Sequence, residues 1–381
     1  MTRPATEPPA ADPLADAVEA ARERALRWIT SMQAPGLPRG VLRISAAHDA
    51  ARWPGVLLPG TYNGIVCLDL LGGLADWGPS ERAALIAWME RSRLPDGRFR
   101  MAGMGEDEVF KKLDPVETWR YIDFHVTNYA LAAIDALDEA HAPLLDFARP
   151  YLDEATLLAW LALRDWRDPW QEGNNIVNLA GFLLAMERFE PYAAPRVQHA
   201  LDLLFDWHDR NQEPATGFWG VGQLSDPLRL KHAFAGSMHN FHIWYARGRP
   251  LPGQERAVDY CLTLPPEIDC ACIDADAVDV LVHGHRMLGY RAAEIERWCR
   301  ALLEALLAFQ NPDGGFADIR EGVRRQDGWV GGYAEPQGLS NTFATWFRWI
   351  AIAMIADLLW PGRWPWRFRR SIGIGYRKAP W

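Results

Sequence analysis

Apolar residues along the chain gather into helical segments of two alternating kinds. One kind carries few charges and is rich in Ala, Leu, Asn, His and aromatic residues, as in 62–75, 124–137, 174–186, 232–245, 274–288 and 339–359. The other kind is amphipathic and charged, as in 14–32, 81–93, 154–164, 195–210 and 291–309. A helix that is apolar all round is buried, whereas a helix with one apolar face lies at a surface. We therefore expect six inner helices wrapped by an outer layer.

Turns that contain Pro and Gly recur after the charged segments. The clearest is Gln310-Asn-Pro-Asp-Gly-Gly-Phe316, and looser relatives occupy 94–99, 211–218 and 33–36. Pro and Gly stop the preceding helix, and the aromatic residue that follows can fold back onto its end. No stretch alternates with a period of two, so the sequence predicts no sheet. The fold class that this pattern predicts is all-α, an (α/α)6 toroid of alternating inner and outer helices.

The turn at 310–316 resembles the QW-type repeat of the terpenoid cyclases and protein prenyltransferase β-subunits. The resemblance covers roughly residues 14–360, and 310–316 is its one clean match. It implies the α/α toroid of that superfamily, with an active site that collects side chains from the starts of the inner helices.

Composition narrows the classes of protein to consider. The formal net charge of -9 argues against a general nucleic-acid binder. Five cysteines without a framework spacing favour reduced thiols in a cytoplasmic protein. Nineteen Trp suit either aromatic packing layers or a cleft for a cation or a sugar. We expect three regions: a disordered N-terminus at 1–13, a toroid domain at 14–360 and a basic, aromatic tail at 361–381.

The strongest candidate for chemistry is a group of three acids, Asp274, Asp276 and Asp279, followed by His283. Asp276, Asp279 and His283 are spaced i, i+3 and i+7, which places them on one helix face. Carboxylates this close in an apolar setting cannot all ionise, so at least one pKa should rise, as a general acid requires. N-terminal capping of the helix by Asp274 is the structural alternative.

The spacing Asp274-x-Asp276 resembles the DxDD signature of class II terpene cyclases, in which the middle Asp protonates an alkene or an epoxide. The resemblance implies that Asp276 is the acid, with Asp274 and Asp279 as its tuning partners. The sequence departs from the signature at Ala277, which stands where the third Asp would be. The second domain that helps to enclose the cyclase cavity has no counterpart here.

Further polar and aromatic residues on the inner segments are predicted to line the same cavity and bind substrate, and they are His125, Asn128, Trp170, Glu172, Asn174, Asn178, His239, His242 and His283. Such a lining is more polar than a hydrocarbon cyclase requires. It favours an alternative, a carbohydrate-active (α/α)6 hydrolase, lyase or epimerase with Glu172 and Asp276 as its pair of carboxyls. Each residue alone is also typical of a hydrogen-bonded structural group.

A metal site is the remaining chemical alternative. Cys270, Cys272, His283 and His285 supply zinc-ligand types. However, His283 and His285 are two residues apart on a helix and face different ways. We therefore predict no metal and no other cofactor, and leave open whether Cys270, Cys272 and His283 bind one.

The segment from 361 to 381 holds six basic residues, five aromatic residues and no acid. This composition suits peripheral contact with an anionic membrane, and packing against the acidic body of the protein is the alternative. The sequence thus predicts a terpenoid-cyclase-like isomerase or lyase with a small, isoprenoid-type substrate. A non-catalytic toroid that binds a ligand or partner stays open, as do the substrate, the product and the oligomeric state.

Overall fold

The computed structural model describes residues 12–104, 115–321, 323–324, 330 and 333–368. In these residues the chain forms twelve α-helices, three short 3-10 turns (Pro54–Val56, Arg149–Leu152 and Pro191–Ala193) and one antiparallel pair of two-residue strands, β1 (Val323–Arg324) and β2 (Glu335–Pro336). The all-α prediction is confirmed. The predicted disordered N-terminus falls almost wholly on residues outside the description, and Asp12 caps the first helix.

Six helices are buried along most of their length: α2 (Leu57–Leu70), α4 (Pro115–Leu137), α6 (Pro169–Phe189), α8 (Pro227–Arg247), α10 (Ala271–Leu288) and α12 (Thr342–Leu359). They correspond to the six predicted inner helices. Three of them, α4, α6 and α8, begin five to nine residues earlier than predicted, at a proline. Proline favours the first helical position, because its missing N–H would have no partner there in any case.

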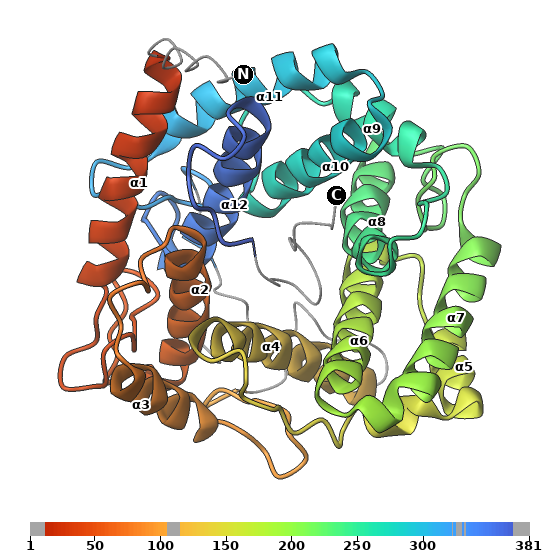
Figure 1. Ribbon diagram of the computed structural model, residues 1–381, viewed down its shortest axis with the longest axis horizontal. Coiled ribbons are helices and arrows are strands. Elements are labelled where there is room, and N and C mark those ends of the chain that lie inside the picture. Colours follow the sequence, from red (N-terminus) through yellow and green to blue (C-terminus); the bar gives the residue numbers. More distant parts are fainter. Residues whose placement is uncertain (1–11, 105–114, 322, 325–329, 331–332, 369–381) are drawn as a thin grey trace, which may run out of the picture.

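The six buried helices contact one another in cyclic order. Each contacts the next along the chain, and α12 also contacts α2, which closes the cycle. Figure 1 shows this ring from its broad face, with the remaining helices outside it. The interior is thus lined by every second helix of the chain.

Ion pairs fix the direction of neighbouring inner helices. Arg188 near the end of α6 pairs with Asp135 of α4 at 2.7 Å, and Arg247 at the end of α8 pairs with Glu187 of α6 at 2.9 Å. Each pair joins two C-terminal ends. The helices α4, α6 and α8 therefore run parallel to one another.

The outer helices are α1 (Pro13–Ser31), α3 (Pro79–Glu90), α5 (Glu154–Ala162), α7 (Ala194–Asn211), α9 (Gln254–Thr263) and α11 (Ala292–Phe309). Helix α9 was not predicted. It has only ten residues and follows a Pro-Gly pair, so the pattern around it looked like a loop. Its buried positions, Ala257, Val258 and Cys261, nevertheless repeat at helical spacing.

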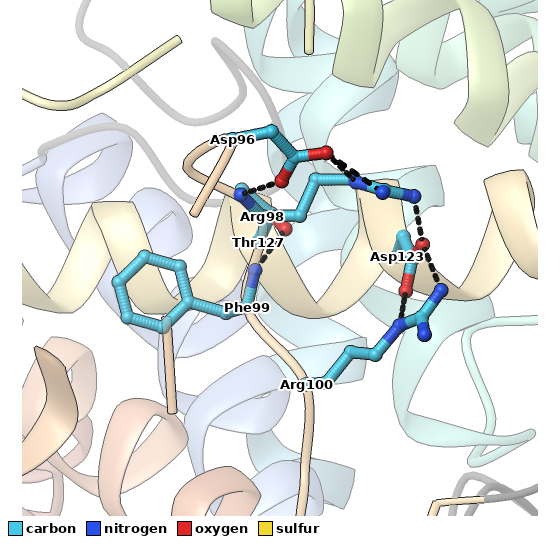
Figure 2. Close-up of polar contacts among 6 residues, drawn as sticks. All are labelled: Asp96, Arg98, Phe99, Arg100, Asp123 and Thr127. Carbon is cyan, nitrogen blue, oxygen red and sulfur yellow. Dashed lines mark hydrogen bonds and ion pairs between the residues drawn. The ribbon is translucent and has the colours of Figure 1, made fainter. Parts of the chain in front are cut away.

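Each of the four predicted turns is tied to the next inner helix by the same kind of buried hydrogen bond. At or shortly after the end of the turn, a backbone N–H donates to a Thr or Ser hydroxyl of that helix, at 2.8–3.0 Å. The pairs are Leu42 with Thr61, Phe99 with Thr127, Trp219 with Ser237, and Phe316 with Thr345. Figure 2 shows the second of them. The repeat seen in the sequence therefore corresponds to a recurring link between a turn and an inner helix.

Two glycines let these turns approach the next outer element. Gly97 has φ +100° and Gly314 has φ +98°. A Cβ on Gly97 would lie 2.0 Å from the carbonyl oxygen of Leu144, and one on Gly314 would lie 2.4 Å from that of Arg24. No other residue fits either position, because both the backbone conformation and the space exclude a side chain.

The segment after α12 packs against the body of the protein as far as residue 368. Trp364 is buried and donates its Nε1–H to Glu19 at 2.6 Å. Arg363 pairs with Asp16 at 2.7 Å. Arg367 lies 3.4 Å from a carboxylate oxygen of Asp69. This part of the predicted tail thus follows the alternative of packing on the acidic body, and residues 369–381 lie outside the description.

Helix α12 is the one helix in the described residues that is long and apolar enough to cross a membrane. The rest of the protein buries 94% of that stretch. All five cysteines are free thiols.

Candidate functional site

The three predicted acids lie in the first half of α10, and all are buried. Asp279 accepts a hydrogen bond from His242 Nε2 of α8 at 3.0 Å, so this face of α10 points toward α8. Asp276 and His283 share the face by helical spacing. The outer helix α9 is also close to this part of α10: a Cβ on Gly284 would lie 2.3 Å from a methyl group of Val258, and the charges of Asp276 and Asp279 add to the effect of burial in raising the pKa of Cys261.

The carboxyl of Asp276 is buried without a hydrogen-bond partner in the described part of the chain. Its exposed fraction is 0%, and neither carboxyl oxygen has a partner among the described residues. Burial raises the pKa of Asp276 well above its usual range, and the nearby charge of Asp279 raises it further. Both effects favour the protonated form of this carboxyl.

Asp279 is the charged member of the cluster. Burial acts to raise the pKa of Asp279, but the adjacent His242 and His283 outweigh it and hold that pKa below its usual value. His283 Nδ1 lies 2.9 Å from the backbone oxygen of Asp279, which marks that nitrogen as the protonated one. Burial lowers the pKa of His283, whose ring stacks on Tyr245 at 4.2 Å. One carboxylate is thus enclosed by two imidazoles beside a neutral acid.

Asp274 belongs to a different group of contacts. It forms a buried ion pair with Arg348 of α12 and accepts the backbone N–H of Asp269 at 3.1 Å. Arg348 also donates to the carbonyl oxygen of Asp318 at 2.8 Å, and burial lowers the pKa of this guanidinium to about 10. The structure thus engages Asp274 with Arg348. The predicted tuning of Asp276 by a neighbouring charge comes from Asp279.

Helical spacing places one polar residue each of α4, α6 and α8 on the face opposite an anchored residue. In each helix an outer-facing anchor precedes the inner residue by two positions, a rotation of about 200°. The anchors are Asp123, Glu172 and Ser237, and the inner residues are His125, Asn174 and His239. Burial lowers the pKa of both His125 and His239 to about 3, so both are neutral.

The anchor of α4 is a carboxylate held by two arginines (Figure 2). Asp123 is wholly buried and pairs with Arg98 at 2.5 Å and with Arg100 at 2.7 Å. Both arginines lie in the turn that follows α3, and Asp96 pairs with Arg98 at 2.7 Å. These bonds fix the rotation of α4 and therefore the direction of His125.

The amides predicted on α6 and α4 are buried. Asn178 is one helical turn beyond Asn174, and neither of its amide atoms has a partner among the described residues. Asn174 donates to the backbone oxygen of Trp170 at 3.0 Å, while its own oxygen has no partner there. Trp170 lies partly buried with its ring 5.5 Å from that of His232. Asn128 lines a small cavity between α4 and α6.

Aromatic rings occupy the interior on the side of α2, α4 and α12. Tyr62 stacks on Tyr129 at 5.2 Å, and Trp346 meets Tyr129 edge-on at 5.3 Å. The ring of His125 lies 4.6 Å from that of Tyr129, and the pKa of His125 responds to His239. The aromatic rings and the acid cluster are therefore linked across the interior by two neutral histidines.

Glu172 does not pair with Asp276. It is buried on α6 and forms an ion pair with Arg164 at 2.7 Å, and the guanidinium of Arg164 lies 4.2 Å from the ring centroid of Trp160. Helix α8 separates α6 from α10 in the ring. The alternative reading of these two carboxyls as one catalytic pair has no support in these contacts.

No group of three or more His, Cys, Asp or Glu side chains in the described residues has the arrangement of a metal site. Cys270 is half-buried, and desolvation is the chief cause that raises the pKa of its thiol to about 12.

A groove of about 900 Å³ lies away from the acid cluster. It is lined by α3 and by residues 137–144, among them Arg82, Glu90 and His141. Nothing in the sequence had marked it.

Several contacts of the site could not be predicted from the sequence. Arg348 and Tyr245 lie on helices other than α10, and the pattern gave no pairing between helices. The unpaired state of Asn178 has no sequence signal at all. Searches against models of known protein families and against curated proteins find no match for this chain.

Proposed function

We propose that this protein is an enzyme with the (α/α)6 toroid architecture of the terpenoid cyclases. In this proposal it starts its reaction by protonating an isoprenoid-type substrate, with Asp276 as the general acid. The observation that carries the proposal is the wholly buried Asp276, whose carboxyl has no hydrogen-bond partner in the described residues and a raised pKa. An alkene has no lone pair to accept a hydrogen bond. An acid that protonates a carbon–carbon double bond therefore fits a site without polar acceptors, such as the surroundings of Asp276.

The neighbours of Asp276 fit this role. Asp279, held ionised by His242 and His283, opposes loss of the Asp276 proton in the resting enzyme. When the Asp276 O–H bond breaks, the π electrons of the alkene form the new C–H bond and leave a carbocation. Aromatic rings such as Tyr129 and Trp346 can stabilise that cation through their faces. Loss of a proton from the product cation returns the acid to its starting state.

The substitution Asp276→Asn tests the assignment. It keeps size and polarity but removes the acidic proton, so turnover should fall by about 10²–10⁴-fold. Asp276→Glu retains an acid and should keep part of the activity. Asp153→Asn, at the exposed N-cap of α5, is the matched control, since Asn caps about as well as Asp.

The measurement is product analysis by gas chromatography and mass spectrometry with squalene, its terminal epoxide and geranylgeraniol. Circular dichroism of each variant establishes that the fold survives. Near-normal turnover in folded Asp276→Asn would rule out Asp276 as the acid.

A second candidate is a carbohydrate-active enzyme. The observation in its favour is the row of amides and neutral histidines on α4, α6 and α8, which suits hydroxyl groups. The ion pair between Glu172 and Arg164 weakens the case for Glu172 and Asp276 as the catalytic pair of such an enzyme. Turnover of an oligosaccharide panel, with no turnover of any isoprenoid, would favour this candidate.

A further inference from the structure

The interior carries hydrogen-bonding groups that protonation of an alkene does not require. Asn178 has an exposed fraction of 0%, and both of its amide atoms lack a partner among the described residues. The side-chain oxygen of Asn174, one turn earlier on the same face, is in the same state. An unpaired buried amide costs about 1–3 kcal/mol, so natural proteins rarely retain one without a ligand for it.

The charge of the interior limits what this ligand group can be. His125 and His239 are neutral because burial lowers the pKa of each to about 3. Nearly every Arg and Lys in the described part of the inner helices is paired with a carboxylate, namely Arg188, Arg229, Lys231, Arg247, Arg286 and Arg348. Arg120, one turn before the outer-facing Asp123, also has an interaction partner. The described part of the inner helices therefore offers a diphosphate no unpaired cation, whereas proteins bind phosphates through such cations.

We infer that Asn174 and Asn178 form a subsite for a neutral oxygen group of the substrate, a hydroxyl or a carbonyl. An amide supplies both a donor and an acceptor, which matches a hydroxyl group. The inference rests on the proposed function for the isoprenoid part of the substrate. It makes that substrate an isoprenoid alcohol or carbonyl compound, and excludes both a plain hydrocarbon and a diphosphate.

Three probes that share one carbon chain test the subsite: farnesol, farnesyl diphosphate and farnesene. Binding is measured by isothermal titration calorimetry with the full chain, so the result does not depend on turnover. Wild type should bind farnesol at least about tenfold more tightly than farnesene, the effect of one or two good hydrogen bonds. Asn178→Leu and Asn174→Leu should each reduce this preference.

The matched control is Asn211→Leu. Asn211 is exposed at the end of α7 and donates to the backbone oxygen four residues earlier, as Asn174 does. The Asn211→Leu variant should keep the wild-type preference for farnesol over farnesene.

A measurement without ligand also tests variants that bind none of the probes. Asn178→Leu should raise the melting temperature, because it removes an unpaired buried amide and keeps the volume.

Each outcome decides something. Tighter binding of the diphosphate, or a farnesol preference that survives in both Leu variants, would overturn the subsite. Absence of binding by every probe, together with a lowered melting temperature of Asn178→Leu, would also overturn it. If cellobiose binds in an Asn178-dependent way and no isoprenoid binds, the neutral subsite stands and the proposed cyclase-like function falls.

Discussion

Two acidic residues three positions apart on α10 have pKa values shifted in opposite directions. Asp276 and Asp279 are both wholly buried, and both would lose solvation on ionising. Only Asp279 has imidazole partners, so its pKa is lowered whereas that of Asp276 is raised. The sequence alone predicted that at least one pKa of the group would rise. Which one depends on His242, thirty-seven residues away in the chain.

The protonated state of Asp276 predicts a pH dependence of stability. Its pKa is raised in the folded state above the unfolded value of about 3.9. Above that value the folded protein binds more protons than the unfolded chain. Stability from this group therefore falls as pH rises, by about 1.4 kcal/mol per pH unit, until the folded pKa is passed.

Asp276→Asn should abolish this slope. The difference in unfolding free energy between the variant and wild type should thus move in favour of the variant between about pH 5 and pH 8. Urea titrations at several pH values measure it. Asp153→Asn serves as the control: the pKa of Asp153 is lowered, chiefly by the backbone N–H of Thr156, so its contribution should stay flat over that range. A flat difference for Asp276→Asn would show that this carboxyl is ionised.

At the scale of elements, the link between turns and inner helices explains why the inner helices could be located from the sequence. Their low charge and the Pro and Gly of the turns are local signals. The start of α6 was misplaced because Glu172, in its first turn, is buried through pairing with Arg164, which lies outside the helix. A pairing of that kind is invisible to periodicity.

Removing a hydroxyl acceptor tests the importance of the links. Thr127→Val and Thr345→Val would each leave a buried backbone N–H, that of Phe99 or Phe316, without an acceptor. Each should lower the unfolding free energy by about 1–3 kcal/mol, whereas the Ser variants keep the bond.

Thr263→Val is the matched control for this experiment, because the Thr263 hydroxyl donates to Tyr260 at an exposed helix end. It should change stability by less than about 0.5 kcal/mol. Denaturant unfolding compares the set. A loss in Thr127→Val and Thr345→Val no larger than that of the control would mean that the links add nothing to stability.

At the scale of the whole molecule, the described part of the C-terminal segment is an extension of the ring. Trp364 packs among buried residues, and Arg363 and Arg367 lie beside Asp16 and Asp69 on α1 and α2. The composition of 361–381 had suggested a single membrane-binding tail. The contacts separate the segment 361–381 into a part that packs on the protein, up to residue 368, and the remainder, because its first two basic residues already have acidic partners.

The last prediction follows from that division. The four basic residues that remain for a membrane are Arg369, Arg370, Arg377 and Lys378. Each is worth about 1 kcal/mol at an anionic surface. Deleting 369–381 should therefore abolish co-sedimentation with phosphatidylserine vesicles and leave the melting temperature unchanged.

Deleting 361–381 should abolish vesicle binding and also lower the melting temperature, because it removes Trp364 and both ion pairs. Replacing the four basic residues by Gln is the matched control, since it removes charge but not length. It should reproduce the vesicle result of the shorter deletion. Equal binding by wild type and the shorter deletion would show that the membrane affinity, if measured, arises elsewhere on the protein.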